Sequence, residues 1–321
     1  MPLLPTSNFK PPFFIRSHHL QTILPTLLRN VPSPKYTRER FETSDGDFFD
    51  VDWSHVDSAD NIVLFIHGLE SSSDSNYIRG VVNAFNRRGW DAAVLNFRGC
   101  SGEINRLYKS YHSGATEDIH TLVTSVSSLN KYKQITLVGF SLGGNATLKY
   151  LGEQGHNTCI TRAAAVSVPC DLKASALRMA EPENALYMRR FIQSFQKKLL
   201  LKEALLPQGI TLQYFAGMRT FQELDDRYTA PAHGFNDAEE YWTFCSANRY
   251  IPNIAIPTLL ISAKDDSFLG KSCFPIEAAE QSSNFFLEIP NYGGHLGFMG
   301  WGKEYWHESR VAGFITGEHY V

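Results

Sequence analysis

The stretch from Leu137 to Asn145, LVGFSLGGN, places one serine, Ser141, between two glycines. Glycine and serine are common turn residues, so the pattern G-x-S-x-G alone also describes an ordinary turn. Here the apolar run 134–140 leads into the pattern and a helical pattern follows it. A strand, a sharp turn at a serine and a helix make a nucleophile elbow, in which glycines leave room around the strained serine. We therefore expect Ser141 Oγ at the carboxyl edge of a buried strand.

Short apolar runs bounded by turn residues recur along the chain, as is typical of strands that are buried on both faces. Amphipathic patterns lie between them, and the clearest begins near Glu117. Alternating strands and helices predict an α/β fold whose mostly parallel central sheet is flanked by helices. The predicted strands are 62–66, 92–97, 134–140, 163–168 and 258–263, and the apolar stretch 285–289 follows them.

This alternation stops between residues 172 and 250, where the sequence shows no convincing buried strand before 211–215. We interpret 172–250 as a helical lid inserted into a core formed by 1–171 and 251–321, with an N-terminal arm, 1–36, packed on that core. Within the insertion, one segment has the pattern of an amphipathic helix. Its apolar residues are Phe191, Ile192, Phe195, Leu199 and Leu200.

A serine hydroxyl needs a base within hydrogen-bonding distance, and the base needs an acid that orients it. His295 follows the last predicted strand in a glycine-rich loop, which favours it over the other histidines as the base. Asp265 and Asp266 follow the run 258–263, and we prefer Asp266 because Phe268-Leu269 supplies an apolar return into the fold. Asp171 is a third candidate acid, although a helix N-cap explains it better. The order Ser, Asp, His is that of the α/β-hydrolase fold.

Ester chemistry also requires two backbone N–H groups that stabilise the oxyanion. One is expected from Leu142, directly after the nucleophile. In the hydrolase fold, the other comes from the loop after the third strand. We expect it from Leu69, because His67-Gly68-Leu69 follows the apolar run 62–66 and Gly68 permits a close approach to the serine. A plain turn is the alternative explanation for this tripeptide.

The formal net charge of −3 gives no electrostatic reason to expect a nucleic-acid partner. The five cysteines are widely spaced and include no C-x-x-C, which favours a reducing compartment such as the cytoplasm over a disulfide framework or zinc site. Prolines interrupt the N-terminal apolar residues, so we expect neither a signal peptide nor a membrane span there. Peripheral membrane contact through Phe13, Phe14 and Ile15 is left open, as is the oligomeric state.

The chain contains no G-x-G-x-x-G, H-E-x-x-H or EF-hand pattern. The run 297–303 resembles a phosphate-binding loop, but Glu304 replaces the Ser or Thr that would hold magnesium. We therefore expect no cofactor and no metal.

These motifs together resemble the YheT-like α/β hydrolases, which are kin of the eukaryotic alpha/beta-hydrolase-domain lipases. The resemblance implies Ser141, Asp266 and His295 as the triad. The chain departs from the family pattern at Ser71, Ile104, Ala115 and Ser267, none of which is a catalytic group. The resemblance rests on HLQTILP (19–25), DGDFFDVDW (45–53), HGLESSSDSNYIRG (67–80), NFRGCSGEINRLYKSYHSGATEDI (96–119), GFSLGGN (139–145), LDDRYTAPAHGFNDAEEYWTFCSA (224–247), AKDD (263–266) and GGHLGF (293–298).

Segment 96–119 matches the sequence pattern of the family closely, but we can assign no catalytic role to it. We interpret it as a loop whose polar groups satisfy buried backbone, with contact to a polar part of the substrate as the alternative.

The resemblance implies activity on esters. Because family members differ in their substrates, it does not identify the substrate of this chain. We expect a serine ester hydrolase that acts on short- to medium-chain acyl esters or lipid-like esters through an acyl-enzyme. Acyl transfer to an alcohol is an alternative within the same chemistry. A non-catalytic binding protein on the same fold is an alternative outside it.

Overall fold

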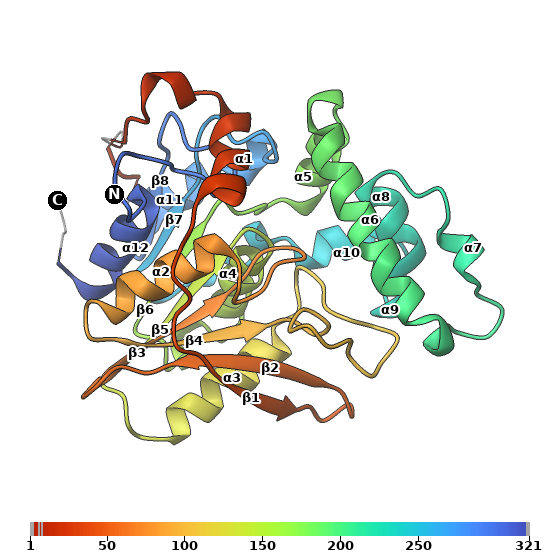
Figure 1. Ribbon diagram of the computed structural model, residues 1–321, viewed down its shortest axis with the longest axis horizontal. Coiled ribbons are helices and arrows are strands. Elements are labelled where there is room, and N and C mark those ends of the chain that lie inside the picture. The colour runs from red at the N-terminus through yellow and green to blue at the C-terminus, as the bar shows by residue number, and fades with distance from the viewer. Residues whose placement is uncertain (1–2, 6, 8, 319–321) are drawn as a thin grey trace.

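The computed structural model of the chain describes residues 3–5, 7 and 9–318. Within them, one eight-stranded sheet runs in the order β1-β2-β4-β3-β5-β6-β7-β8 (Figure 1). The six strands from β3 to β8 are parallel, whereas β2 pairs antiparallel with both β1 and β4 at one edge. The strands are β1 (Thr37–Glu42), β2 (Phe48–Ser54), β3 (Asn61–Ile66), β4 (Asp91–Asn96), β5 (Gln134–Phe140), β6 (Arg162–Val166), β7 (Thr258–Ile261) and β8 (Phe285–Glu288).

Helices cover both faces of this sheet (Figure 1). The strands are apolar on both faces and need cover on both. In β3, Ile62, Leu64 and Ile66 pack on one face of the sheet, and Val63 and Phe65 pack on the other. Helices α3, α4 and α11 contribute to the first apolar layer, and α2 and α12 contribute to the second. The helices are α1 (His18–Leu28), α2 (Asn76–Asn86), α3 (Glu117–Ser128), α4 (Leu142–Gln154), α5 (Leu172–Met179), α6 (Ala185–Leu201), α7 (Leu212–Phe215), α8 (Phe221–Leu224), α9 (Ala230–Ala232), α10 (Ala238–Cys245), α11 (Ile276–Gln281) and α12 (Trp306–Thr316).

The predicted parallel strands are confirmed to within a few residues at their ends. The run 163–168 ends early, because Ser167 has a φ of 53° and cannot continue a strand. Strands β1 and β2 were not among the predicted ones. β2 carries Asp50 and Asp52, which a strand rarely buries, and Arg40 and Arg38 of β1 bind these two carboxylates.

Residues 172–250, all of which the structure describes, contain helices and turns but no strand. A strand at 211–215 remained possible from the sequence, but the structure has the short helix α7 there. Helices α5 to α10 stand to one side of the sheet (Figure 1). They enclose an apolar cluster of their own, which includes Ile192, Phe195 and Leu199 of α6. Leu200 was predicted on this buried face but is exposed.

The N-terminal arm reaches α1 through a 3-10 turn, η1 (Phe13–Ile15), and α1 contacts α2. Residues 1–2, 6 and 8 of this arm lie outside the described residues. None of the described helices has the length and apolar character needed to cross a bilayer.

Candidate active site

Ser141 occupies the sharp turn between β5 and α4, with φ 51° and ψ −120°. This backbone conformation is energetically unfavourable for a non-glycine residue, so the surrounding packing must enforce it. A Cβ on Gly139 would lie 2.5 Å from the carbonyl oxygen of Gly143, and a Cβ on Gly143 would collide with the carbonyl oxygens of Ile66 and His67. Both glycines are therefore required for the tight turn that presents Ser141.

The loop after β8 brings His295 to this turn. His295 Nε2 lies 2.9 Å from Ser141 Oγ, and His295 Nδ1 lies 2.9 Å from Asp266 Oδ2. The side chain of Asp266 is fully buried, and its other oxygen accepts the Phe268 N–H at 3.0 Å. The structure thus brings the three predicted residues into one hydrogen-bonded chain, although they are far apart in sequence.

The two rival acids have other partners. Asp265 Oδ1 accepts the N–H of Gly294 at 3.0 Å, and burial raises the pKa of Asp265 to about 6. Asp171 caps α5 by accepting the Ala174 N–H at 3.0 Å, as the N-cap explanation predicts. Asp265 therefore holds the glycine-rich loop beside His295, and Asp171 is not part of the site.

The predicted oxyanion loop, His67-Gly68-Leu69, lies against Ser141. A Cβ on Gly68 would lie 3.2 Å from Ser141 Cβ, so the two backbones are close. Leu69 and Leu142 both line the cavity that contains Ser141. Among the described residues, neither of their N–H groups has a hydrogen-bond acceptor. These two donors are therefore free to bind an oxygen that enters the cavity.

Three side chains hold this loop. His67 is fully buried between Gly68 O, 2.8 Å from its Nδ1, and the Phe97 N–H, which donates to its Nε2 at 3.1 Å. A carbonyl only accepts and an N–H only donates, so Nδ1 carries the proton; burial lowers the pKa of His67 to about 4. Tyr77 accepts the Gly68 N–H at 2.8 Å and donates to Ser71, also at 2.8 Å. Ser71, where the chain departs from the family pattern, thus accepts a hydrogen bond that helps to hold the loop.

Two contacts to His295 were missed by the sequence analysis. The Phe268 ring stacks on the imidazole with centroids 4.2 Å apart. Thr22 of α1 accepts the backbone N–H of His295 at 2.9 Å. Phe268 had been noted only as an apolar return, and Thr22 lies within the family motif HLQTILP, which was the available signal. The arm therefore helps to hold the candidate base.

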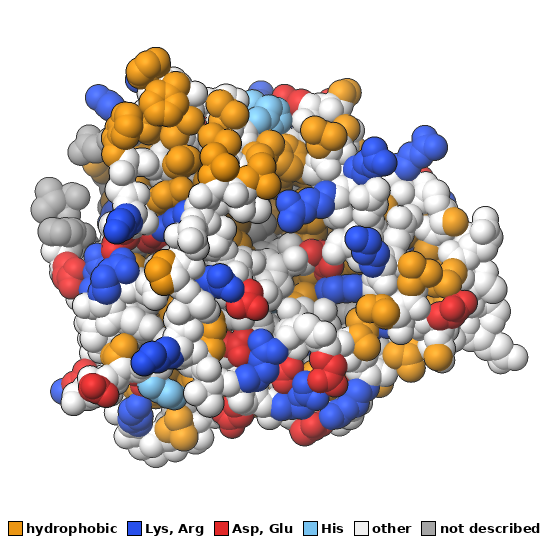
Figure 2. Space-filling model, viewed as in Figure 1, with side chains coloured by type: hydrophobic (Ala, Val, Ile, Leu, Met, Phe, Trp, Pro, Cys, Tyr) orange, Lys and Arg blue, Asp and Glu red, His pale blue; other side chains and the backbone are white. Residues whose placement is uncertain are grey.

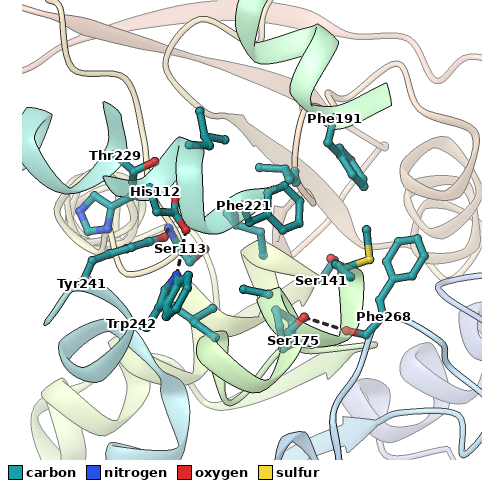
Figure 3. A pocket seen from close by; sticks show the side chains of 18 of the residues that line it. His112, Ser113, Ser141, Ser175, Phe191, Phe221, Thr229, Tyr241, Trp242 and Phe268 are labelled. Atoms are coloured by element: carbon teal, nitrogen blue, oxygen red, sulfur yellow. Dashed lines mark hydrogen bonds between the residues drawn. The ribbon is translucent and has the colours of Figure 1, made fainter. Parts of the chain in front are cut away.

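An apolar cavity of about 100 Å³ extends from Ser141 beneath the insertion. Figure 3 shows Ser141 and Phe268 at one end and Thr229, Tyr241 and Trp242 at the other. Phe191 and Phe221, from the insertion, form part of the wall between them.

The far end of this cavity is polar. Asp225 accepts the Trp242 Nε1–H at 2.8 Å, and burial raises its pKa to about 7. His112 lies at the same end, and burial holds its pKa well below the ordinary range. The cavity therefore changes from apolar beside Ser141 to polar at its far end.

A second cavity of about 490 Å³ also includes Ser141 and His295. Its walls come from α1, the loop after β3 and the start of α6, and they include Thr22, Glu70 and Arg190. The serine thus lies between a narrow apolar cavity and a wider, more polar one. An ester could place its acyl part in the first and its alcohol part in the second.

Segment 96–119 has the backbone contacts that the structural interpretation predicts, but its residues Tyr111, His112 and Ser113 also line the cavity that contains Ser141, as the alternative of a substrate contact requires. Asn105 donates to the carbonyl oxygens of Leu107 and Lys109 at 3.2 and 2.8 Å. Arg98 binds both oxygens of the Asp118 carboxylate, at 2.8 and 2.7 Å. These groups hold the loop in place.

One group of side chains in the described part of the chain has the composition of a metal site. It comprises His18 and His19 of α1 and Glu183 of η3 (Pro182–Asn184), whose potential ligand atoms lie within 4.8 Å of one another. His19 Nδ1 already lies 3.0 Å from the Tyr187 hydroxyl. The group is outside the hydrogen-bonded chain of Ser141, His295 and Asp266.

A mostly parallel sheet, a serine at a strand-to-helix elbow and a histidine after the last strand define the class of α/β hydrolases. Comparison with known proteins agrees, because residues 61–300 match the family model of the alpha/beta hydrolase fold. "Putative esterase YheT" of Escherichia coli K12 is 36% identical over 309 residues, which cover 93% of this chain and 90% of that protein. The chain therefore belongs to the α/β-hydrolase family and, within it, to the YheT-like group.

Other relatives carry lipase names. Mouse "Phospholipase ABHD3" is 30% identical over 92% of this chain and 74% of its own length. Human "Monoacylglycerol lipase ABHD2" is 29% identical over 93% of this chain and 76% of its own length. A solved esterase of Pyrococcus furiosus shares the fold, with a TM-score of 0.58 at 18% identity over 91% of this chain and 98% of that one. The protein is thus a hydrolase of the esterase and lipase type.

Proposed function

We propose that the protein is a serine carboxylester hydrolase in which Ser141 is the nucleophile, His295 the base and Asp266 the orienting acid. The observation that carries this proposal is the pair of 2.9 Å contacts from His295, one to Ser141 Oγ and one to Asp266 Oδ2. The buried Asp266 carboxylate accepts the Nδ1–H, which leaves Nε2 free to receive a proton from the serine.

In the first half of the reaction, the Ser141 Oγ–H proton passes to His295 Nε2 as Oγ bonds to the ester carbonyl carbon. The carbonyl oxygen becomes an oxyanion, which the N–H groups of Leu69 and Leu142 stabilise. The imidazolium then protonates the leaving alkoxide, and the acyl group stays on Ser141. In the second half, water gives a proton to His295 as its oxygen bonds to the acyl carbon. The imidazolium then returns the proton to Ser141 Oγ as the acyl–Oγ bond breaks, and the carboxylic acid leaves.

The preferred acyl groups are of short to medium length. The narrow cavity is apolar near Ser141, where each additional buried CH₂ contributes roughly 0.8 kcal/mol. Its far end carries Asp225, His112 and Tyr241, which an alkyl chain would leave without water. Activity should therefore rise with chain length and then fall. Residues 172–250 act as the lid in this proposal, because they supply most of the cavity wall around the core formed by 1–171 and 251–321.

The direct test is Ser141→Ala. The variant should lose cleavage of p-nitrophenyl esters and labelling by a fluorophosphonate, since both need the Oγ nucleophile. Circular dichroism and thermal unfolding should match the wild type. Turnover that survives undiminished would remove Ser141 from the mechanism. Esters of graded chain length, assayed in parallel, test the acyl preference.

Acyl transfer remains the second candidate, favoured by the wider cavity that reaches Ser141 from the alcohol side. Product ratios in water with added ethanol separate the two, because a transferase would form mainly the ethyl ester. We further propose a reducing, cytoplasmic environment, in keeping with five cysteines that are all free.

A further inference from the structure

Helix α1 exposes apolar side chains that a surface helix ordinarily buries. Its sequence, HHLQTILPTLL, contains no Asp, Glu, Lys or Arg, yet its one fully buried residue is Gln21. Leu27 and Leu28 are 71% and 69% exposed. A helix packed on a globular core normally turns its apolar stripe inward and its polar residues outward. In α1 a glutamine is buried while Leu27 and Leu28 face solvent, and Ile23 and Leu24 are only half-buried.

Aromatic side chains extend this apolar surface. Phe13 and Phe14 of η1 are 78% and 57% exposed, and Trp301, from the loop before α12, is 79% exposed. The rings of Phe14 and Trp301 meet edge to face, with centroids 5.8 Å apart. We define the arm patch as Phe13, Phe14, Leu27, Leu28 and Trp301. Figure 2 shows hydrophobic side chains gathered along the edge formed by η1 and α1. Ile15, expected in this contact from the sequence, is instead buried.

Basic residues predominate in the segments that carry the arm patch, although Glu183 lies beside His18 and His19 and Glu304 follows Lys303. The first acidic residue of the chain is Glu39, whereas Lys10, Arg16, Arg29, Lys35 and Arg38 precede it. Arg29 and Arg38 bind Glu308 and Asp52, but Lys10, Arg16 and Lys35 are exposed. The loop that carries Trp301 is also free of acids between 289 and 303, and it ends at Lys303. This basic surface stands out in a chain whose net charge is −3.

The arm patch is continuous with the mouth of the candidate active site. Leu27 and Thr22 of α1 line the same cavity as Ser141 and His295. Thr22 also holds the His295 backbone. Leu186, at the start of α6 across from α1, is another exposed leucine, 78% accessible. The two helices meet there, where the Tyr187 hydroxyl lies 3.0 Å from His19 Nδ1. The wider cavity thus opens beside the exposed Leu27 of α1, and Leu186 is exposed on the neighbouring helix α6.

We propose that the arm patch docks on the surface of a bilayer that contains anionic phospholipids, so that lipid esters enter the wider cavity directly. Exposed aromatic and leucine side chains beside lysine and arginine are the composition of interfacial helices. A second copy of this chain fits less well, because a two-fold contact would bring the basic residues of the two arms together. Anionic headgroups instead neutralise them. Docking itself does not depend on catalysis, whereas delivery of an ester to Ser141 rests on the function proposed above.

Vesicle flotation tests the docking without catalysis if every protein carries Ser141→Ala. The vesicles are phosphatidylcholine alone, or phosphatidylcholine mixed with phosphatidylglycerol. The patch variant is Phe13→Ser, Phe14→Ser and Trp301→Ser, none of which lines either cavity. Lys10→Gln with Arg16→Gln tests the charge. The matched control, Leu129→Ser with Phe244→Ser, removes side chains that are 58% and 47% exposed elsewhere.

We expect the parent protein and the control to float with the mixed vesicles, and the patch variant to lose at least about tenfold in partitioning. The charge variant should lose its preference for mixed over neutral vesicles. With Ser141 restored, the patch variant should hydrolyse soluble p-nitrophenyl butyrate as the wild type does.

Failure of the parent protein to bind vesicles, or equal binding by the patch variant, would overturn the proposal. So would a dimer in sedimentation velocity that the patch variant dissociates, because the patch would then be an interface between two copies. None of these outcomes bears on whether Ser141 is the nucleophile, which the turnover and labelling of Ser141→Ala decide.

Discussion

Two adjacent carboxyl groups, Asp265 and Asp266, differ in what each one faces. The Asp266 carboxylate is buried against the imidazole of His295, which can donate a proton to it. Asp265 faces the backbone N–H of Gly294 and leaves its Oδ2 buried without a partner among the described residues. Burial therefore raises the pKa of Asp265 to about 6, so it carries less negative charge near neutral pH than an exposed aspartate would.

This difference predicts unequal effects of the same substitution. Asp266→Asn should lower kcat by roughly 10³- to 10⁴-fold, because an amide favours the wrong imidazole tautomer. Asp265→Asn keeps an oxygen that accepts the Gly294 N–H, so its kcat should change by less than about tenfold. Steady-state kinetics on one p-nitrophenyl ester measure both. A larger loss in Asp265→Asn would reassign the acid.

At this scale, sequence motifs identified the three residues that the structure brings into one hydrogen-bonded chain. Ser141, Asp266 and His295 each follow a recognisable strand, and the hydrolase order links them. Thr22 could not be found in that way. Thr22 accepts the His295 N–H although the two residues are 273 positions apart, and the family motif HLQTILP marks the position of Thr22 without indicating that contact. Only the folded arm makes that contact.

Helix α6 is tied to the oxyanion loop through a partly buried cluster around Glu70, the residue after Leu69. Glu70 Oε1 accepts from Lys198 Nζ at 2.7 Å and from the Tyr111 hydroxyl at 2.8 Å, and Oε2 accepts from Ser194 Oγ at 2.5 Å. Glu70 also has a φ of 53°, which few residues adopt without support. The insertion and the oxyanion loop are therefore held by the same carboxylate.

A double-mutant cycle should expose this coupling. Glu70→Gln leaves Lys198 without its ion pair, and Lys198→Met leaves Glu70 charged and largely buried, so each should cost about 1–3 kcal/mol of stability. The double variant should recover part of the loss, because no unpaired charge remains. Urea unfolding measures all four proteins. Strict additivity of the two losses would mean that the pair is not coupled.

Elements with mostly local patterns were predicted well, whereas those that depend on distant partners were not. The parallel strands are continuous apolar runs, which indicate burial on both faces. β2 reads FFDVDWS, and its aspartates argue against a buried strand until Arg38 and Arg40 of β1 are known to pair with them. That pairing becomes visible only after the two strands have been placed side by side.

At the scale of the whole molecule, four of the described histidines are withdrawn from water, His67 and His307 fully and His112 and His233 in part. Burial lowers the pKa of His67 to about 4, lowers those of His233 and His307 to about 3, and holds that of His112 well below its ordinary value. His307 is fully buried, and neither ring nitrogen has a partner among the described residues. In the unfolded chain all four would titrate near their ordinary value of about 6.5.

These shifts fix the sign of what each imidazole contributes to the pH dependence. A lowered folded pKa means that the unfolded state binds more protons below about pH 6.5, so stability is present above that pH and is lost as the pH falls toward 4. Asp225 and Asp265 oppose this, because their pKa values are raised to about 7 and about 6 and the folded state binds their protons first. Burial also raises the pKa values of Asp118, Glu288 and Glu308, which oppose the loss in the same way. The contribution of an imidazole is therefore tested by removing that imidazole alone.

The variant His307→Phe tests the argument, since it removes one of these imidazoles from an aromatic environment that includes Phe140 and Phe298. Between pH 6 and 4.5 its unfolding free energy should fall less steeply than that of the wild type, by about 1.4 kcal/mol per pH unit, which corresponds to one proton. His156→Phe, at an exposed position, is the control and should keep the wild-type slope. Urea unfolding at several pH values gives the slopes. If His307→Phe and the wild type lost stability in parallel, His307 would already be protonated in the folded protein, and its burial would contribute nothing to the pH dependence.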